Sequence, residues 1–197
     1  MSFPEGAIFE TMLAGGVALW DVSDLLPRRY DRKRRVGIKR LYVHHSGRLG
    51  ANGFWGAYNS ARYVVEQRKP RFPGPAYTFW IPYGDHTDAD DNRVVYRCNP
   101  DDVRSWHTGG GANSHGIACC LQGNTNKREI SQHQIECLEA LIPWCVERYG
   151  LELPDGLSWH SEAGRFRGRV KRTCPGVSAE AWLSAYRNAT EEEHGPS

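Results

Sequence analysis

Apolar and polar residues follow one another along this chain in blocks that predict strands and helices in alternation. Compact apolar runs predict four strands, at residues 38–44, 77–82, 94–97 and 116–121. Apolar residues recur at helical intervals in two further segments, 54–67 and 131–149. Strands and helices interspersed in this order indicate an α/β fold, with a mixed central β-sheet packed by helices.

The two predicted helices have clear ends. Pro70 and the prolines that follow it stop the first helix. Ser131 opens the second helix with Gln134 in a capping-box pattern, and Gly150 ends it. Pro143 lies inside this second helix and should kink it.

The length of 197 residues and the hydrophobic content of 40% fit one globular domain with a substantial core. We expect residues 1–37 to be a lead-in with a basic segment, irregular or partly helical as far as about Tyr30. Residues 38–190 should form the domain itself, with a last helix capped by Ser178. The acidic residues 191–197 are expected to be a disordered tail.

Charge alone does not dictate a partner, because the net charge is only +2, although residues 28–40 are densely basic. Clustered cations are typical of proteins that bind nucleic acid. No aromatic stacking platform or known reading motif accompanies them here. We therefore expect no nucleic acid partner, and we interpret the stretch as a solvated face or as a source of attraction to an anionic cell envelope.

The N-terminus lacks the positively charged start of a secretory signal. The apolar stretch Met12–Trp20 is too short, and too interrupted by glycine, to span a bilayer. We expect a protein made in the cytoplasm, without a signal peptide or a transmembrane segment. We also expect a monomer.

The six cysteines do not follow the spacing of a disulfide framework, and Cys119 and Cys120 are adjacent. We therefore expect reduced thiols. Cys137 and Cys145 fall on the helical pattern and are interpreted as core residues. Cys174 lies instead in a polar loop flanked by proline and glycine, which indicates a chemical role.

Three residues that are far apart in the sequence could together bind zinc. His44 ends the first apolar run, and His160 and Cys174 follow in the last quarter of the chain. Two imidazoles and a thiolate leave a fourth tetrahedral position for water, which distinguishes catalytic from structural zinc. A core histidine or a buried thiol is the alternative for each residue taken alone. His45 adds another alternative, because adjacent strand residues point to opposite faces and an apolar run cannot choose between them.

Motifs spread over roughly residues 38–185 recur in a characteristic order. They are Tyr42–Ser46, Ala76–Phe79, Trp106–Gly109, Asn113–Gly123, Arg148–Leu151, Trp159–His160 and Thr173–Gly176. In this order and at these separations they resemble the zinc-dependent N-acetylmuramoyl-L-alanine amidases, a family that shares its fold with bacteriophage T7 lysozyme and the peptidoglycan recognition proteins.

The resemblance implies that His44, His160 and Cys174 are the zinc ligands, and it selects His44 over His45. It also implies hydrolysis of the amide that joins N-acetylmuramic acid to L-alanine in peptidoglycan. Zinc in such a site lowers the pKa of water and polarises the scissile carbonyl. Tyr77 matches the family's active-site tyrosine, a catalytic residue that orients the water or donates a hydrogen bond to the oxyanion.

Two positions depart from the family's pattern. Arg172, expected to be catalytic, lies where several relatives carry lysine; arginine can stabilise an oxyanion but is poorly suited to proton transfer. Cys120 lies where some relatives place a glutamate proposed as general base. Proton transfer therefore stays open among Tyr77, His107, Lys171 and Arg172.

We expect the peptidoglycan or muropeptide substrate to contact His45 and the loop residues Trp106 and His107. The loop between the second and third zinc ligands is longer than is usual in the family and is rich in arginine. Its Arg165 and Arg167 are hypothesised to bind carboxylates of the stem peptide. A solvated surface loop is the alternative.

A single catalytic domain without a signal peptide or a wall-binding module resembles a phage-type endolysin, which acts on the cell wall after it leaves the cytoplasm. The alternatives are a cytoplasmic muropeptide-recycling amidase and a non-catalytic peptidoglycan-binding module. Retention of all three candidate ligands argues against the binding module, because binding alone does not need an open metal site.

Overall fold

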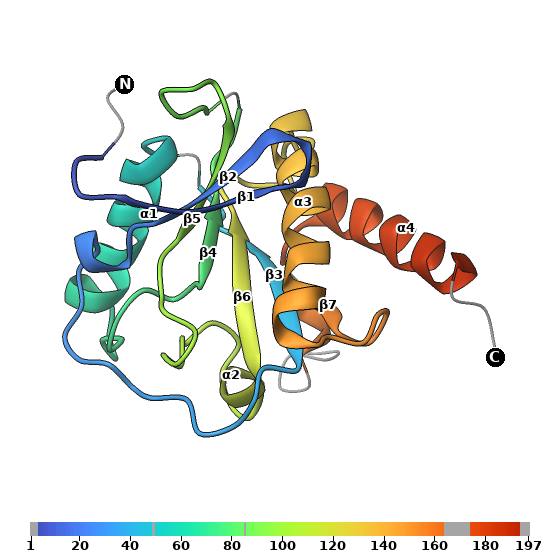
Figure 1. Cartoon of the computed structure of the whole chain (residues 1–197). Coiled ribbons are helices and arrows are strands. Elements are labelled where there is room, and N and C mark those ends of the chain that lie inside the picture. Colours follow the sequence, from blue (N-terminus) through green and yellow to red (C-terminus); the bar gives the residue numbers. More distant parts are fainter. Residues whose placement is uncertain (1–3, 49, 85, 164–173, 194–197) are drawn as a thin grey trace.

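The computed structural model describes residues 4–48, 50–84, 86–163 and 174–193. A seven-stranded sheet forms its centre, with the strand order β1-β2-β5-β4-β6-β3-β7 (Figure 1). The strands are β1 (Ile8–Leu13), β2 (Val17–Asp21), β3 (Arg40–His45), β4 (Phe79–Ile81), β5 (Arg93–Arg97), β6 (Gly116–Leu121) and β7 (Leu157–Trp159). The helices are α1 (Gly53–Arg62), which continues as a π-helix (Tyr63–Gln67), α2 (Ala112–His115), α3 (Gln132–Tyr149) and α4 (Val177–Glu193). The expected α/β fold with a mixed central sheet is confirmed.

Strand β3 lies between two parallel neighbours. It pairs with β6 and with β7, and β4 in turn pairs in parallel with β6. The carboxyl ends of these strands therefore meet at the same end of the sheet. Strand β6 is buried along its whole length, as expected for a parallel strand that is covered on both faces.

Helices cover both faces of the sheet (Figure 1). Helices α3 and α4 pack on one face, where Val43 belongs to the largest core cluster. Helix α1 packs on the other face, where Phe54 shares a second cluster with Trp80 and Cys120. His44 is in register with Cys120 on the neighbouring strand, so its side chain points to the α1 face.

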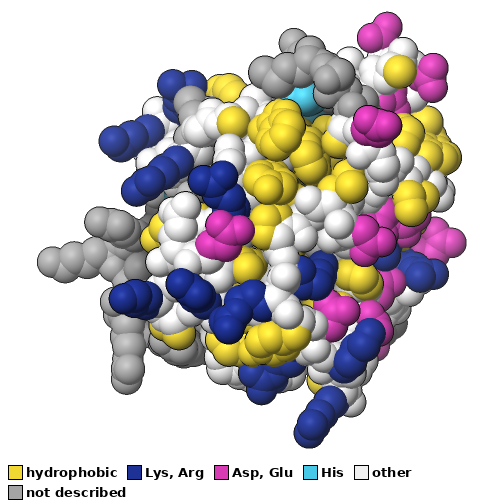
Figure 2. All heavy atoms as spheres, turned by 90° about the vertical axis from the view of Figure 1, so that its left-hand side faces the viewer, with side chains coloured by type: hydrophobic (Ala, Val, Ile, Leu, Met, Phe, Trp, Pro, Cys, Tyr) yellow, Lys and Arg dark blue, Asp and Glu magenta, His cyan; other side chains and the backbone are white. Residues whose placement is uncertain are grey.

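The face that carries α1 and the segment 27–38 is seen in Figure 2. Lysine and arginine side chains gather over its lower half, below a patch of hydrophobic side chains. Among the described residues, no helix is both long enough and apolar enough to cross a membrane.

Helix α3 has the ends that its sequence predicts. The Ser131 hydroxyl accepts a hydrogen bond from the Gln134 backbone N–H at 3.2 Å, and the Gln134 side chain accepts one from the Ser131 N–H at 3.4 Å. Gly150 ends the helix in the left-handed region, with φ of 63°. The helix is continuous through Pro143, and the kink expected there stays a prediction.

The cysteines are free thiols, as expected. Cys137 and Cys145 are fully buried in the core on the inner side of α3. Cys119 and Cys120 point to opposite faces of β6 and are also buried. Cys174 alone of the six is half-buried, which sets it apart from the core thiols.

The expected irregular or partly helical lead-in is wrong. Residues 8–21 form β1 and β2, which pair antiparallel across a short 3-10 turn at Ala14–Gly16. Gly15 and Gly16 have positive φ angles of 66° and 71°, which glycine adopts without strain. Strand β2 pairs in parallel with β5, so the lead-in extends the central sheet.

Three further details at the C-terminal end correct the sequence prediction. Helix α4 continues to Glu193, so residues 191–193 of the expected tail are helical; residues 194–197 lie outside the described residues. Ser178 is the second residue of α4 and does not cap it; its hydroxyl accepts a hydrogen bond from the Ile130 N–H at 2.9 Å. Strand β7 was not predicted, because three residues are too short to show a period.

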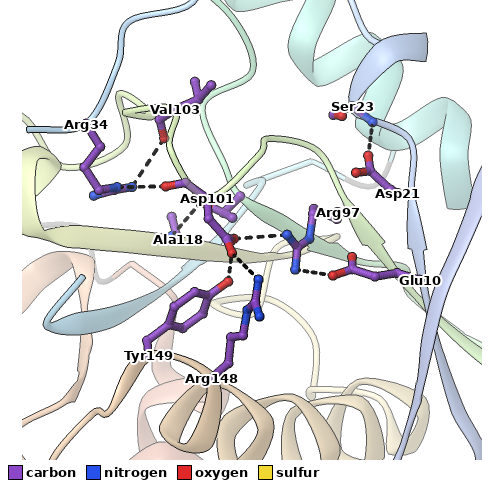
Figure 3. A network of polar contacts seen from close by, with 11 residues as sticks. Glu10, Asp21, Ser23, Arg34, Arg97, Asp101, Val103, Ala118, Arg148 and Tyr149 are labelled. Atoms are coloured by element: carbon purple, nitrogen blue, oxygen red, sulfur yellow. Dashed lines mark hydrogen bonds and ion pairs between the residues drawn. The ribbon is translucent and has the colours of Figure 1, made fainter. Parts of the chain in front are cut away.

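A polar network ties the lead-in to the rest of the domain (Figure 3). Arg97, whose side chain is only 7% exposed, forms ion pairs with Glu10 on β1 at 2.6 Å and with Asp101 at 3.0 Å. Asp101 also accepts hydrogen bonds from the Tyr149 hydroxyl at 2.6 Å and from Arg148 at 3.3 Å. The buried guanidinium of Arg97, on β5, thus connects to β1 through Glu10 and to the end of α3 through Asp101.

Candidate metal centre

The three predicted zinc ligands lie together. His44 is the last residue but one of β3, and His160 begins a 3-10 turn directly after β7, the parallel neighbour of β3. The His44 and His160 ring centroids are 4.6 Å apart, and His44 Nδ1 lies 3.8 Å from Cys174 Sγ. One donor atom from each residue can be chosen so that all three lie within 4.8 Å of one another.

One pair of these donor atoms already has the separation that a zinc ion needs, and the widest separation in the set, up to 4.8 Å, would have to shorten on binding. Bonds of about 2.0–2.1 Å to nitrogen and about 2.3 Å to sulfur place tetrahedral ligand atoms roughly 3.3–3.7 Å apart. The observed 3.8 Å between His44 Nδ1 and Cys174 Sγ is close to that range. His44 is 1% exposed, whereas His160 and Cys174 are half-buried, so these two ligands lie nearer the surface than His44.

Burial keeps the imidazoles neutral. Desolvation, with a smaller contribution from neighbouring histidines, lowers the pKa of His44 well below its usual value. Burial also lowers the pKa of His160 to about 4. Both rings can therefore present a lone pair at neutral pH. Burial raises the pKa of Cys174 to about 12, so this group is a thiol without metal and loses its proton on ligation.

His107 lies behind His44 and contacts the nitrogen that faces away from Cys174. His44 Nε2 and His107 Nδ1 are 3.1 Å apart, and the two rings meet edge to face. Burial, opposed in part by the Gly116 carbonyl, lowers the pKa of His107 to about 3. A neutral His107 can accept the Nε2–H of His44, which leaves His44 Nδ1 free for a metal. His107 itself is only 8% exposed.

A single amide holds the loop that carries His107. Asn113 Oδ1 accepts backbone hydrogen bonds from His107 at 3.1 Å, from Thr108 at 2.9 Å and from Gly109 at 3.1 Å. It also accepts one from the Thr108 hydroxyl at 3.1 Å. The sequence analysis missed this role of Asn113. The signal available was an asparagine that follows a glycine run, where its side chain can replace missing backbone partners.

His45 points away from His44, as adjacent residues of a strand must. Its Nδ1 lies 3.0 Å from the Thr125 hydroxyl, which in turn donates to the Pro175 carbonyl. Gly176, with φ of 104°, packs so closely that a methyl group there would overlap Thr125. The structure thus places His45 where it holds the segment that carries Cys174.

Tyr77 lies beside His44, with their ring centroids 5.3 Å apart. Burial, with smaller contributions from the nearby Cys120 and Cys174, raises the pKa of Tyr77 well above its usual value. The phenol therefore keeps its proton, and the Cys120 thiol lies beside it. Cys120 is fully buried, and burial raises its pKa as well.

Of the remaining predicted residues, only Trp106 falls within the described ranges. Trp106 is half-buried and packs edge to face on Phe72, with ring centroids 5.5 Å apart. Arg165, Arg167 and Arg172 lie outside the described residues, together with Lys171.

A cavity of about 340 Å³ lies between α1 and the loop that follows β3. Its lining is mostly polar or glycine, with two aromatic residues: Ser46, Arg48, Gly50, Ala51, Gly56, Asn59, Ser60, Tyr63 and Trp80. Trp80 is in register with Cys120, which in turn is in register with His44, so the cavity begins on the same face of the sheet as the three ligands. The sequence analysis did not find this cavity, because its lining comes from three separate segments.

Comparison with known protein families identifies the chain. The model of the N-acetylmuramoyl-L-alanine amidase family (Amidase_2) matches residues 32–177, a range that includes all three candidate ligands. The chain belongs to this family. No curated protein sequence matches the chain.

Solved structures share the fold of this amidase-family chain at low sequence identity. The endolysin amidase LysCS from Clostridium intestinale is 17% identical, with a TM-score of 0.64 over 86% of this chain and 95% of that chain. Drosophila PGRP-LB is 15% identical, with a TM-score of 0.66 over 86% and 94% of the two chains. Drosophila PGRP-SA is 18% identical, with a TM-score of 0.64 over 82% and 86%. The amidase-like fold inferred from the sequence motifs is thereby confirmed.

Proposed function

We propose that this amidase-family chain is a zinc-dependent hydrolase that cleaves the amide between N-acetylmuramic acid and L-alanine in peptidoglycan. The observation that carries the proposal is the convergence of His44, His160 and Cys174, whose candidate ligand atoms all lie within 4.8 Å of one another. A zinc ion held by these residues would acidify water and polarise the scissile carbonyl.

The surrounding residues have separate roles in this proposal. Tyr77 stays protonated and lies beside His44, so it can donate a hydrogen bond to the carbonyl oxygen as negative charge develops there. His107 fixes the orientation of His44, and His45 holds the segment of Cys174. Both histidines therefore support candidate ligands, and their expected contacts with the substrate stay a proposal.

The cavity beside α1 is proposed to hold part of the muropeptide. Its hydroxyl, amide and guanidinium groups can bind sugar hydroxyls and peptide carbonyls, and Tyr63 offers an aromatic face. Arg165, Arg167 and Arg172 are still proposed as partners of stem-peptide carboxylates or of the oxyanion. These three come from the sequence alone.

Two observations favour an endolysin over the alternatives. LysCS, which has the same fold, is described as an endolysin amidase, and all three ligand donors are present here, although binding alone would not need them. A PGRP-LCa and PGRP-LCx complex with bound tracheal cytotoxin also has this fold, so binding without cleavage is the second candidate.

The test is cleavage of purified peptidoglycan with and without a chelator, followed by mass spectrometry of newly exposed L-alanine amines. We expect the protein to cleave peptidoglycan, a chelator to abolish this cleavage and zinc to restore it. The Cys174→Ala variant should show no cleavage. Cys137→Ala is the matched control, because that thiol is buried in the core away from the centre. Intact lactyl-alanine bonds would refute the proposal. Cleavage of soluble muropeptides but not of intact sacculi would identify a recycling enzyme in place of an endolysin.

A further inference from the structure

Many lysine and arginine side chains lie on the face of the molecule that Figure 2 shows. Six of them form what we call the basic surface: Arg29, Arg32, Arg68, Lys69, Arg71 and Arg104. Five are exposed and Arg104 is half-buried. Within the ranges that the structure describes, no Asp or Glu forms an ion pair with any of the six.

The six cations come from three segments that lie side by side. The backbone N–H of Arg29 donates to the Pro73 carbonyl at 2.7 Å, and the N–H of Arg104 donates to the Arg32 carbonyl at 2.7 Å. A cavity of about 360 Å³ is lined by Arg29 and Arg71 together. The basic surface is therefore continuous across segments 27–35, 65–73 and 104–106.

Aromatic rings hold two of its guanidinium groups in place. Arg68 lies 4.4 Å from the Phe72 ring centroid, Arg32 lies 5.3 Å from that of Trp106, and the two rings pack against each other. The rings thus serve to orient charge. Among the described residues of the three segments, Tyr30 is the one exposed aromatic side chain, so the surface does not present a row of free aromatic planes on which bases could stack.

Nearby carboxylates do not neutralise the basic surface, because each is paired with a different cation. Asp31 pairs with Arg28 at 2.7 Å, Glu66 lies 3.8 Å from Arg62, and Asp102 pairs with Lys33. Uncompensated like charges repel one another. Binding of an anionic polymer would relieve this repulsion, and the release of counterions would make the binding more favourable.

We propose that the basic surface binds a phosphate-rich anionic polymer carried by the bacterial cell wall. The surface adjoins the candidate metal centre, because Trp106 directly precedes His107 and packs in one cluster with Tyr77. A wall polymer bound there would hold the enzyme beside its substrate. The choice of a wall polymer rests on the proposed function, whereas the charge arrangement does not.

The test compares two variants with the same change in net charge. Arg29→Gln/Arg32→Gln/Lys69→Gln/Arg71→Gln removes four cations of the basic surface, and Lys39→Gln/Arg40→Gln/Lys127→Gln/Arg128→Gln removes four exposed cations elsewhere. Binding is measured by co-sedimentation with purified walls, either intact or stripped of phosphate polymer by acid, over a salt titration. Cleavage of a soluble muropeptide is measured in parallel, and duplex DNA is used as a competitor.

We expect the surface variant to bind intact walls at least about tenfold more weakly at 0.1 M salt, with a shallower salt dependence, while the control variant binds like the native protein. Stripped walls should bind all three proteins equally weakly. Equal losses in the two variants, binding that is indifferent to the phosphate polymer, or tighter binding to DNA would each overturn the proposal. Soluble muropeptide cleavage reports on the metal centre separately, so a failed amidase proposal would not be confused with a failed surface.

Discussion

Replacement of His107 tests how the candidate metal centre is oriented. In His107→Phe the ring volume is retained, but the acceptor 3.1 Å from His44 Nε2 is lost. When Nδ1 of His44 binds zinc, its proton must reside on Nε2, where it would then be buried without a partner. In the zinc-free protein the proton can move to the other nitrogen, so the cost falls mainly on the metal-bound state.

The size of the effect follows from that argument. An unsatisfied buried donor costs about 1–3 kcal/mol, which is roughly a 5- to 150-fold loss of zinc affinity. Loss of a hydrogen-bond partner behind a metal ligand typically costs about 10- to 100-fold. We therefore expect zinc affinity to fall by about 10- to 100-fold, with little change in the thermal unfolding midpoint of the zinc-free protein.

Competition with a chromophoric chelator measures the affinity, and thermal unfolding after exhaustive chelation measures the stability. His107→Asn is the informative partner, because its side-chain oxygen can occupy the place of Nδ1 and should restore part of the affinity. His133→Phe is the control, because that histidine is equally buried but contacts Cys137 in α3. Unchanged affinity in His107→Phe, or equal losses in the Phe and Asn variants, would refute the reasoning.

Three other outcomes are expected. Tyr77→Phe should lower the turnover of muropeptide cleavage in steady-state kinetics by about 10- to 1000-fold, while zinc affinity measured by calorimetry stays within about twofold. A parallel loss of zinc affinity would contradict the role of the phenol as a hydrogen-bond donor. Gly176→Ala should weaken zinc binding in chelator competition, because the methyl group overlaps Thr125 and displaces the Cys174 segment; wild-type affinity would disprove this packing. Burial raises the pKa of Glu10, so folding favours its protonated form. In urea unfolding, the stability of the native protein should therefore fall relative to that of Glu10→Gln as the pH rises from 4 to 6. A stability that instead rises relative to Glu10→Gln over this range would contradict the raised pKa.

The sequence was most informative where a pattern is local. The limits of β6 and the capping box of α3 were predicted closely, because a buried parallel strand and a capped amphipathic helix each have a strong local pattern. The approach of His44, His160 and Cys174 was predicted from family order, and the parallel pairing of β3 with β7 supplies its physical cause.

The failures concern contacts that no local pattern encodes. Strand β1 exposes Ile8, Phe9 and Met12 to solvent, so it lacks the alternation of a half-buried strand, and its place in the sheet depends on pairing with β2. Ser178 has the composition of a helix cap, but its hydroxyl is used by the distant Ile130 N–H.

The role of His107 shows the same limit at the candidate site. Its expected contact with the substrate stays a prediction, whereas its contact with His44, which joins residues 63 positions apart in the sequence, was not predicted. Only the folded arrangement of β3 against the Asn113-braced loop reveals that contact.

The wide sequence separation of the ligands has a consequence for synthesis of the protein. His44 and Cys174 are 130 residues apart, and at about 5–20 residues per second a ribosome needs roughly 6 to 26 s to make the segment between them. During that interval a nascent chain exposes one ligand without the others. The three candidate ligands are therefore all present only after nearly the whole domain has been made, and a truncated product that lacks the end of the chain would contain β3 and α3 but an incomplete ligand set.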